Sequence, residues 1–179
     1  MPDLIPFEEI THLFEDFEHT AWRLETQRGY ASDSQGANWQ RWKAGEAIGR
    51  YEPQHPWHAN VRAQTGAGKR FERVRLVDDP PTEGQRFLLA SGLGNVEAGE
   101  DIRNLRRSDA RRSGLPDYDF WLFDSRVVIK FVIDGEGVTQ GVLVLEDAAS
   151  VVRACQARDA AWHYAVATRE FQAQVPSAM

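Results

Sequence analysis

Three short segments rich in β-branched and aromatic residues follow one another closely in the last third of the chain, at 120–124, 127–133 and 138–145. Such segments are typical of β-strands. The residues Asp134-Gly135-Glu136-Gly137 join the last two segments and have the composition of a hairpin turn. The chain is therefore expected to contain a β-sheet, and its other segments must be compatible with one.

Helical and extended patterns alternate around these strands. The cluster Asp78-Asp79-Pro80-Pro81 ends one extended segment, and Thr82 is placed to cap the helix that follows. The order from Trp57 onward, α-β-α-β-β-β-β-α, predicts an α/β fold of the mixed α+β type, with a mixed sheet flanked by helices. The further expected elements are helices at 57–67, 82–96 and 147–171, strands at 71–77 and 101–105, and a helical turn at 108–112.

The first third of the chain is expected to pack on this core. Phe7, Ile10, Phe14 and Phe17 recur at helical spacing, so residues 7–18 are expected to form one amphipathic helix. A short helix from Ser32 or Asp33 to about Gly45 is also expected.

A strand is expected at 20–26, because Trp22 and Leu24 alternate with Arg23 and Glu25. The expected organisation is a helical and strand segment at 1–55 as an N-terminal extension, an α/β domain at 56–171 and a tail at 172–179.

Composition and charge argue against several classes of protein. With 179 residues, 42% of them hydrophobic, the chain can bury one core. A formal charge of -6 argues against nonspecific nucleic-acid binding, and the arginines at 103–112 indicate a solvated face. No apolar run approaches the ~18 residues of a membrane span, and the N-terminus lacks a signal-peptide pattern. The single Cys155 cannot form an internal disulfide, which fits the cytoplasm. Without a phosphate loop or dinucleotide fingerprint, no cofactor is expected.

Arginines on neighbouring strands are candidate site residues. Arg73 and Arg75 are two residues apart on an expected strand and therefore share one face. Arg103 and Arg106 are expected nearby on another strand. Convergent guanidinium groups can bind an anion. Acidic partners can instead neutralise them, and this buried ion-pair network is the favoured interpretation.

Glu100, Asp101, Asp119 and Asp124 form an acidic group. Such clusters bind hard cations and serve two-metal hydrolysis. Asp119 and Asp124 lie five apart on one strand, and an odd separation directs them to opposite faces. Asp101 can pair with Arg103. Structural ion pairs are therefore favoured over catalysis, with ligand contact as the remaining alternative.

Among the histidines, His163 is the best candidate for a functional imidazole, because it lies beside Trp162 and one turn beyond Arg158. A packed helix histidine is the default interpretation. The pair His55-x-x-His58 could supply two metal ligands, but no third ligand follows at useful spacing, so no metal site is expected. Cys155 belongs to an apolar helix stripe and is expected in the core.

Five phrases are distributed over most of the chain: RLET at 23–26, RVR at 73–75, AGEDIR at 98–103, DFWLFDS at 119–125 and RDAAW at 158–162. In these phrases the chain resembles a family of uncharacterised actinobacterial proteins. Genes for such proteins often lie beside helix-turn-helix regulators. The resemblance implies a regulatory role and a DNA-binding protein as partner.

A second resemblance covers residues 57–167. A Gly-bounded helix leads to the strand RVRLV at 73–77, the strand opened by AGxxxR at 98–103 comes next, and WxxA follows at 162–165. In this order the chain is similar to the phospholipase-D-like sensor domain of some bacterial regulators. The resemblance implies a phospholipase-D-like half domain.

The motif of that family departs here from its pattern. Phospholipase-D-like domains carry His-x-Lys-x4-Asp on a strand, and the same register in this chain gives Asp117, Asp119 and Asp124. Two carboxylates in a phosphate pocket would repel the substrate. The resemblance therefore implies a fold that serves sensing or regulation and not phosphoester chemistry.

We expect a non-enzymatic, cytoplasmic regulatory or ligand-sensing protein that acts through a partner such as a helix-turn-helix regulator. No catalytic residue is assigned. The alternative is a metal-dependent hydrolase or nuclease, toxin-like, that uses Glu100, Asp101 and Asp124 with His163. The residues expected to line or brace the ligand site are Arg73, Arg75, Glu100, Asp101, Arg103, Asp119, Trp121, Asp124, Arg158, Trp162 and His163.

Overall fold

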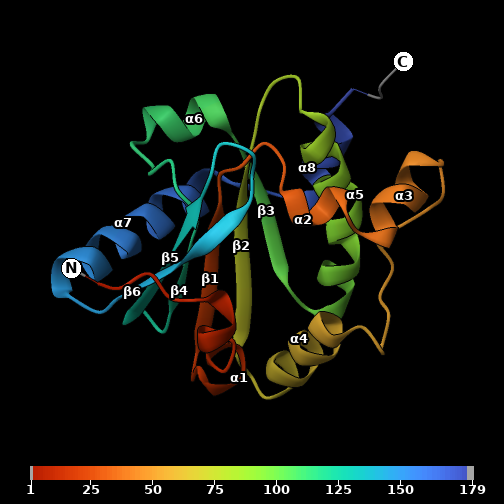
Figure 1. The fold of residues 1–179 in the computed structure, drawn as a ribbon. Coiled ribbons are helices and arrows are strands. Elements are labelled where there is room, and N and C mark those ends of the chain that lie inside the picture. The colour runs from red at the N-terminus through yellow and green to blue at the C-terminus, as the bar shows by residue number, and fades with distance from the viewer. Residues whose placement is uncertain (1, 177–179) are drawn as a thin grey trace.

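A seven-stranded mixed sheet forms the centre of the molecule, in the order β6-β5-β4-β1-β2-β3-β7 (Figure 1). This computed structural model describes residues 2–176. Strands β1, β2 and β3 are parallel, whereas β4, β5 and β6 form an antiparallel meander beside β1. The predicted mixed sheet flanked by helices is confirmed. The strands are β1 (Thr20–Glu25), β2 (Arg70–Val77), β3 (Asp101–Arg106), β4 (Phe120–Phe123), β5 (Val127–Ile133), β6 (Thr139–Leu145) and β7 (Val166–Ala167).

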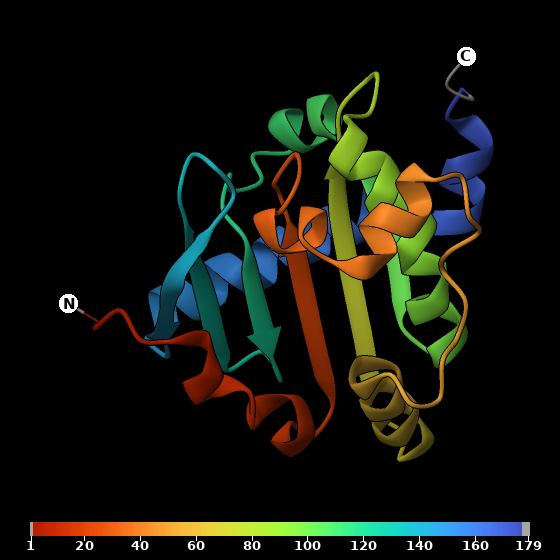
Figure 2. The same ribbon diagram turned by 45° about the vertical axis from the view of Figure 1, so that its right-hand side comes forward.

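Helices cover both faces of the sheet. The front face carries Phe71 and Trp121 and packs against the N-terminal helices, α4 and α5, whereas the back face carries Trp22 and Val74 and packs against α6 and α7. In Figures 1 and 2, α7 passes behind the sheet, and α2, α4 and α5 lie in front of it. The helices are η1 (Phe7–Ile10, a 3-10 helix), α1 (Leu13–Asp16), α2 (Ala31–Ser34), α3 (Ala37–Lys43), α4 (Pro56–Gly66), α5 (Glu83–Ala98), α6 (Arg107–Arg112), α7 (Ala148–Tyr164) and α8 (Thr168–Gln174).

Strand β1 is the middle strand of the sheet. It pairs with β2 in parallel and with β4 in antiparallel orientation, so residues before position 56 supply the centre of the sheet. Every residue of β1 except Thr20 is buried. The alternation of Arg23 and Glu25 with apolar residues therefore does not mark a solvent-facing side, because helices cover both faces.

Three predicted helices are each divided in the structure. The helix expected from Ser32 or Asp33 to about Gly45 is α2 followed by α3. The helix expected at 7–18 is η1 followed by α1, although Ile10, Phe14 and Phe17 are buried on the front face, as their spacing indicates. The final helix ends at Tyr164, and β7 then pairs with the outer edge of β3 before α8 begins. Pairing with this edge satisfies backbone groups that a continuous helix would leave open. Of the expected tail, residues 177–179 lie outside the described residues.

Three of the locally signalled ends of elements are confirmed, whereas the cap expected at Ser32 or Asp33 is wrong, because α2 begins at Ala31 after the N-cap Tyr30. Thr82 caps α5 in a capping box with Gln85, and Asp147 caps α7 through the backbone N–H of Ser150. The turn after β5 closes through Asp134, which accepts the N–H groups of Glu136 and Val138. These caps fix where α5 and α7 begin against the sheet.

Candidate functional site

The front face of the sheet carries buried charged side chains on adjacent strands. Arg23 and Glu25 of β1 lie directly beside Arg73 and Arg75 of β2, because these residues are register partners in the parallel pair. Residues paired in register point to the same face of a sheet. We call the connected group of three arginines and three carboxylates the ion-pair network; it comprises Arg23, Arg73, Arg75, Glu25, Glu100 and Asp119.

Glu25 is the centre of the ion-pair network. Its Oε1 accepts hydrogen bonds from Arg23 Nε at 3.2 Å and from Arg73 Nη1, and its Oε2 accepts one from Arg75 Nε at 2.6 Å. Burial alone raises the pKa of the Glu25 carboxyl, but the charges of its three arginine partners outweigh burial and lower that pKa far below its ordinary value of 4.5. Glu25 is therefore a fixed negative charge between three cations.

Asp119 closes one end of the network, at the start of β4. Its Oδ2 accepts hydrogen bonds from Arg23 Nη2 at 3.0 Å and from the Tyr30 hydroxyl at 2.6 Å. Its Oδ1 accepts from the backbone N–H and the hydroxyl of Thr26, both at 2.7 Å. Burial, together with the negative charges of Glu25 and Asp119, raises the pKa of Tyr30, so its phenol stays a hydrogen-bond donor.

Glu100 closes the other end, between α5 and β3. Its Oε1 accepts from Arg73 Nε at 2.6 Å and its Oε2 from the Trp57 indole N–H at 3.1 Å. Burial alone lowers the pKa of the Arg73 guanidinium, but the charges of Glu100 and Glu25 raise it above its ordinary value. Each carboxylate of the network therefore holds donors on both of its oxygens.

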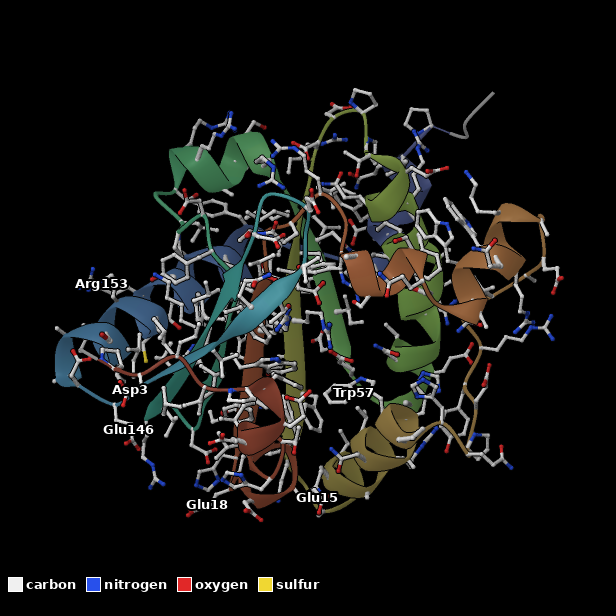
Figure 3. The ribbon with its side chains drawn as sticks, viewed as in Figure 1. Asp3, Glu15, Glu18, Trp57, Glu146 and Arg153 are labelled. Carbon is white, nitrogen blue, oxygen red and sulfur yellow. The ribbon has the colours of Figure 1, made fainter. Side chains whose placement is uncertain are left out.

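Aromatic rings flank the two arginines nearest the surface. The Arg23 guanidinium carbon lies 4.3 Å from the centre of the Phe131 ring and 5.5 Å from that of Trp121. Arg73 lies 5.4 Å from the Trp121 ring and 5.9 Å from that of Trp57. Trp57 is labelled in Figure 3, above α4 and beside the sheet. Cation–π contacts at these distances hold the guanidinium groups in fixed orientations.

A cleft of about 1110 Å³ opens over this part of the network. Residues 4–8 form one rim, and the segment is held there by the backbone pairing of Ile5 with Val142 of β6. The cleft combines a charged floor with apolar walls, which is the arrangement of small-molecule sites. Its floor and walls include Phe7, Phe14, Arg23, Glu25, Ser32, His55, Trp57, Asn60, Arg73, Asn95, Trp121 and Phe131.

A second hollow of about 350 Å³ adjoins the cleft and shares Ser32, His55 and Asn95 with it. Asp33 lines this hollow, and its buried Oδ2 has no hydrogen-bond partner among residues 2–176. Burial, and after it the negative charge of Glu25, raises the pKa of Asp33 from 3.8 to about 6. Asp33 is thus a carboxyl whose ionised form is disfavoured in the folded protein.

Asp33→Asn is expected to stabilise the protein near neutral pH. Because the folded-state pKa of Asp33 is raised to about 6, its stabilising contribution is present below the ordinary value of 3.8 and is lost as the pH rises through about 6. The free energy of unfolding of the variant should exceed that of the wild type by about 2–3 kcal/mol at pH 8, and this difference should shrink toward pH 4. Urea unfolding at both pH values checks this, with the exposed Glu136→Gln as control; a gain that is independent of pH would contradict it.

Of the two histidines His55 and His58, the second has a structural role. His58 is buried, its Nδ1 accepts the backbone N–H of Glu52 at 3.0 Å, and its Nε2 lies 3.0 Å from Asn95 Oδ1. This arrangement places the proton of the neutral ring on Nε2. Within the described part of the chain, no group of three or more His, Cys, Asp or Glu side chains is placed to hold a metal ion.

The remaining predicted site residues lie away from the cleft. Arg103 is on the back face, where its guanidinium stacks on Trp162 at 3.7 Å and its Nη2 binds Asp101 at 3.0 Å, as the predicted pair. Arg158 Nη1 binds the Ser125 hydroxyl at 2.7 Å. His163 is exposed on α7 and contacts Tyr164. The structure thus gathers Arg73, Arg75, Glu100, Asp119 and Trp121 at the front face, and separates from them Asp101, Arg103, Asp124, Arg158, Trp162 and His163.

Asp124 holds the start of β1. Its Oδ1 accepts the backbone N–H groups of His19 and Thr20 at 2.7 and 2.9 Å, and its Oδ2 accepts that of Glu18 at 2.8 Å. Burial raises the pKa of the Asp124 carboxyl, but the three N–H donors together outweigh burial and lower that pKa below its ordinary value of 3.8. Asp119 and Asp124 thus lie at opposite ends of β4 with separate structural roles.

Asp124→Asn is expected to lower the free energy of unfolding by about 1–3 kcal/mol, since one amide group must replace a carboxylate oxygen that accepts a backbone N–H. Asn tolerates the positive φ of 51° at this position, so the change tests the hydrogen bonds and not backbone strain. Urea unfolding of the variant beside the exposed control Asp16→Asn measures the loss. A loss no larger than that of the control would contradict the capping role.

The sequence interpretation did not include Arg23, Glu25, Tyr30, Asp33 and Trp57 as site residues. A signal was present for the first two, because Arg23 and Glu25 alternate with Trp22 and Leu24 in the same way as Arg73 and Arg75 alternate with Val74 and Leu76. Two such strands can pair their charges if they are neighbours. The other three residues come from helices and loops, and only the fold brings them to the sheet.

Comparison with known proteins gives one family. Within residues 2–176, no helix combines the length and the apolar character needed to cross a membrane. No curated protein and no solved structure matches the chain. A family model described as a domain of unknown function (DUF6879) matches residues 8–173, which include every element from α1 to β7. The chain therefore belongs to this DUF6879 family.

Proposed function

We propose that this protein is a non-enzymatic sensor, which binds a small molecule in the cleft above the ion-pair network and acts through a partner protein. The observation that carries the proposal is the cleft itself, of about 1110 Å³, with Arg23 and Arg73 at its floor and partly exposed aromatic rings at its sides. Fixed polar groups under an apolar opening give a ligand both orientation and buried area.

The state of the three carboxylates of the ion-pair network supports binding over catalysis. A general base or a metal ligand needs a free carboxylate oxygen. Both oxygens of Glu25, of Glu100 and of Asp119 already accept hydrogen bonds from side chains or backbone of the same site. These groups hold the arginines in place, and the arginines present donors to the cleft. Such a site orients a ligand.

The partner and the location belong to the same proposal. A formal charge of -6 disfavours direct binding to nucleic acid, so control of transcription would require a DNA-binding protein. The resemblance to actinobacterial proteins encoded beside helix-turn-helix regulators supports a partner of that type. The weaker resemblance to phospholipase-D-like sensor domains supports sensing, and the single cysteine fits a cytoplasmic setting.

Thermal unfolding with fractionated small-molecule extracts of the host tests the sensing step. A ligand at a concentration of 100 times its dissociation constant adds about 2.7 kcal/mol to the free energy of unfolding. This raises the melting temperature by several degrees in a domain of this size. Ser32→Trp should remove that rise, because exposed Ser32 lines the cleft. Ser34→Trp, two residues further on α2 and also exposed, is the matched control. An equal loss in both variants would contradict the cleft as the binding site.

The partner step is tested in a host that encodes a helix-turn-helix regulator beside the gene, with that regulator in purified form. Its affinity for operator DNA should change at least about tenfold when the protein is added, a coupling of about 1.4 kcal/mol. The small molecule should alter this change, and the Ser32→Trp variant should not respond to it. Steady turnover of a phosphodiester by the pure wild-type protein would overturn the non-enzymatic proposal.

A further inference from the structure

The chemistry of the cleft floor points to the class of the ligand. We infer that the cleft takes an uncharged molecule that presents a carbonyl-type oxygen, such as an amide, lactam or lactone, on a flat apolar ring system. The inference rests on the proposed binding function and adds what the ligand must look like. Three features of the cleft carry it: surplus donors, neutralised charge and aromatic walls.

Every carboxylate oxygen of the network already accepts a hydrogen bond. Glu25 takes three arginine N–H groups, Glu100 takes one arginine and one indole N–H, and Asp119 takes one arginine, one phenol and two donors of Thr26. Each of the six carboxylate oxygens has at least one donor. A ligand that brings further donors would find few acceptors at this floor.

The donors of the network are in surplus. Each guanidinium carries five N–H groups. Arg23 and Arg73 each use two nitrogens within residues 2–176, which leaves Nη1 of Arg23 and Nη2 of Arg73 without a described partner. Both arginines line the cleft, and they lie side by side as register partners of β1 and β2. An oxygen acceptor held between them would receive charge-assisted hydrogen bonds, which are stronger than neutral ones.

The charge around the cleft disfavours an anion. Three arginines and three carboxylates balance within the network. Glu8 and Glu15 add negative charge at the rim, and the described lining contains no basic residue other than Arg23, Arg73 and His55. Burial, and after it the neighbouring His58, lowers the pKa of His55, which disfavours a positive charge on its ring. A neutral acceptor meets the donors without this repulsion.

The walls fit a flat apolar body. Phe7 and Trp57 are partly exposed at the cleft, and Trp121 and Phe131 lie beneath them against the arginines. Phe7 lies 5.6 Å from Phe131, and Trp57 lies 6.0 Å from Trp121, measured between ring centres. Aromatic side chains spaced in this way accept a further ring by offset or edge contacts.

A matched probe set tests the inference. We would measure binding of 2-naphthamide, 2-naphthoate and 2-naphthylmethylammonium, which share one ring system and differ only in the polar group. The amide should bind at least about tenfold more tightly than either charged probe, because it forms a hydrogen bond with the arginines and brings no unfavourable charge into the cleft. The amide should shift the Trp57 indole resonance in nitrogen-15 spectra. Ser32→Trp should weaken its binding, and Ser34→Trp should not.

The outcomes separate the inference from the function on which it rests. Tighter binding of the naphthoate or of the ammonium probe in the cleft, or equal binding of all three, would overturn the inference and leave the cleft as a binding site. Failure of all three probes to bind would also overturn the inference. The proposed sensing function fails only if the host extracts also give no stabilisation that Ser32→Trp removes.

Discussion

Glu25→Gln is expected to lower the free energy of unfolding by about 3–5 kcal/mol, because it removes the anion that three buried arginines share. The side chain of Glu25 is only 6% exposed, so water cannot replace the lost charge. The glutamine amide would also place a donor where an arginine N–H now points. The free energy of unfolding of a domain is about 5–15 kcal/mol in total, so the variant should be largely unfolded at moderate urea concentration.

The control for this prediction is Glu46→Gln. Glu46 pairs with Arg41 at 3.0 Å, but the two side chains are 56% and 47% exposed, so the loss should stay below about 1 kcal/mol. Urea unfolding of wild type and both variants, followed by far-UV circular dichroism, gives the comparison. A loss below about 1 kcal/mol in Glu25→Gln would show that the network does not hold the sheet.

The pH dependence of the same variant has a definite sign. The folded-state pKa of Glu25 is lowered, so its contribution is fully present above the ordinary value of 4.5 and is lost as the pH falls through the folded-state value. The difference in stability between wild type and Glu25→Gln should therefore be largest at neutral pH and decrease as the solution is acidified below about pH 4.5. Urea unfolding along this range checks the direction.

The parts of the fold that depend on local signals could be predicted from the sequence. Thr82 with Gln85 marks the start of α5, and Asp134 with its glycines marks the turn between β5 and β6. Capping and turn chemistry act within four residues, so the sequence displays them directly. For this reason the secondary elements between 56 and 145 were predicted with small errors at their ends.

The order of the strands in the sheet could not be predicted from local sequence signals. β1 and β4 pair although about a hundred residues separate them in sequence, through contacts such as Trp22 with Leu122. No local pattern states which strands become neighbours. Once β1 lies beside β2, Arg23 and Glu25 must meet Arg73 and Arg75, and the ion-pair network follows. The favoured interpretation of Arg73 and Arg75 as part of a salt network was correct, but its central anion could not be named without the topology.

The face of the sheet on which each side chain lies was also difficult to predict. Arg103 was expected near Arg73, and it is on the adjacent strand, yet its register partner is Val74. An offset of one residue in register sends a side chain to the opposite face of a sheet. Arg103 therefore stacks on Trp162 of α7, behind the sheet. Register depends on the lengths of the connecting elements, which sequence patterns give only to within a few residues.

A buried network of this kind is costly to form. Replacing buried ion pairs by apolar residues of similar size is often neutral or stabilising, so stability alone does not explain six charged side chains at one site. Here the network lies at the floor of a cleft and includes guanidinium nitrogens of Arg23 and Arg73 that have no partner among residues 2–176. A binding role accounts for the position of the network better than a purely structural role. The network rigidifies two arginines that a flexible surface site would leave disordered.

Asp119→Ala is expected to lower the free energy of unfolding by about 3–5 kcal/mol and to weaken ligand binding in the cleft. The change leaves the Thr26 backbone N–H, one Arg23 N–H and the Tyr30 hydroxyl without their acceptor in a buried site. It also frees Arg23, which Asp119 holds beside the cleft. The matched control is Asp117→Ala, since Asp117 is exposed two residues earlier and should change stability by less than about 0.5 kcal/mol.

A double variant distinguishes a connected network from separate ion pairs. Glu25 and Asp119 both bind Arg23, at Nε and Nη2, so removing either already releases part of the same guanidinium. The combined loss in a double variant that carries both Glu25→Gln and Asp119→Ala should therefore be smaller than the sum of the single losses, by about 0.5–3 kcal/mol. The double variant is expected to be unfolded in buffer alone. The free energies of unfolding of the wild type, the two single variants and the double variant are therefore measured near pH 5 in a stabilising osmolyte such as sucrose. Strict additivity would contradict the network and would assign Asp119 to the local hold on Thr26 and Tyr30 alone.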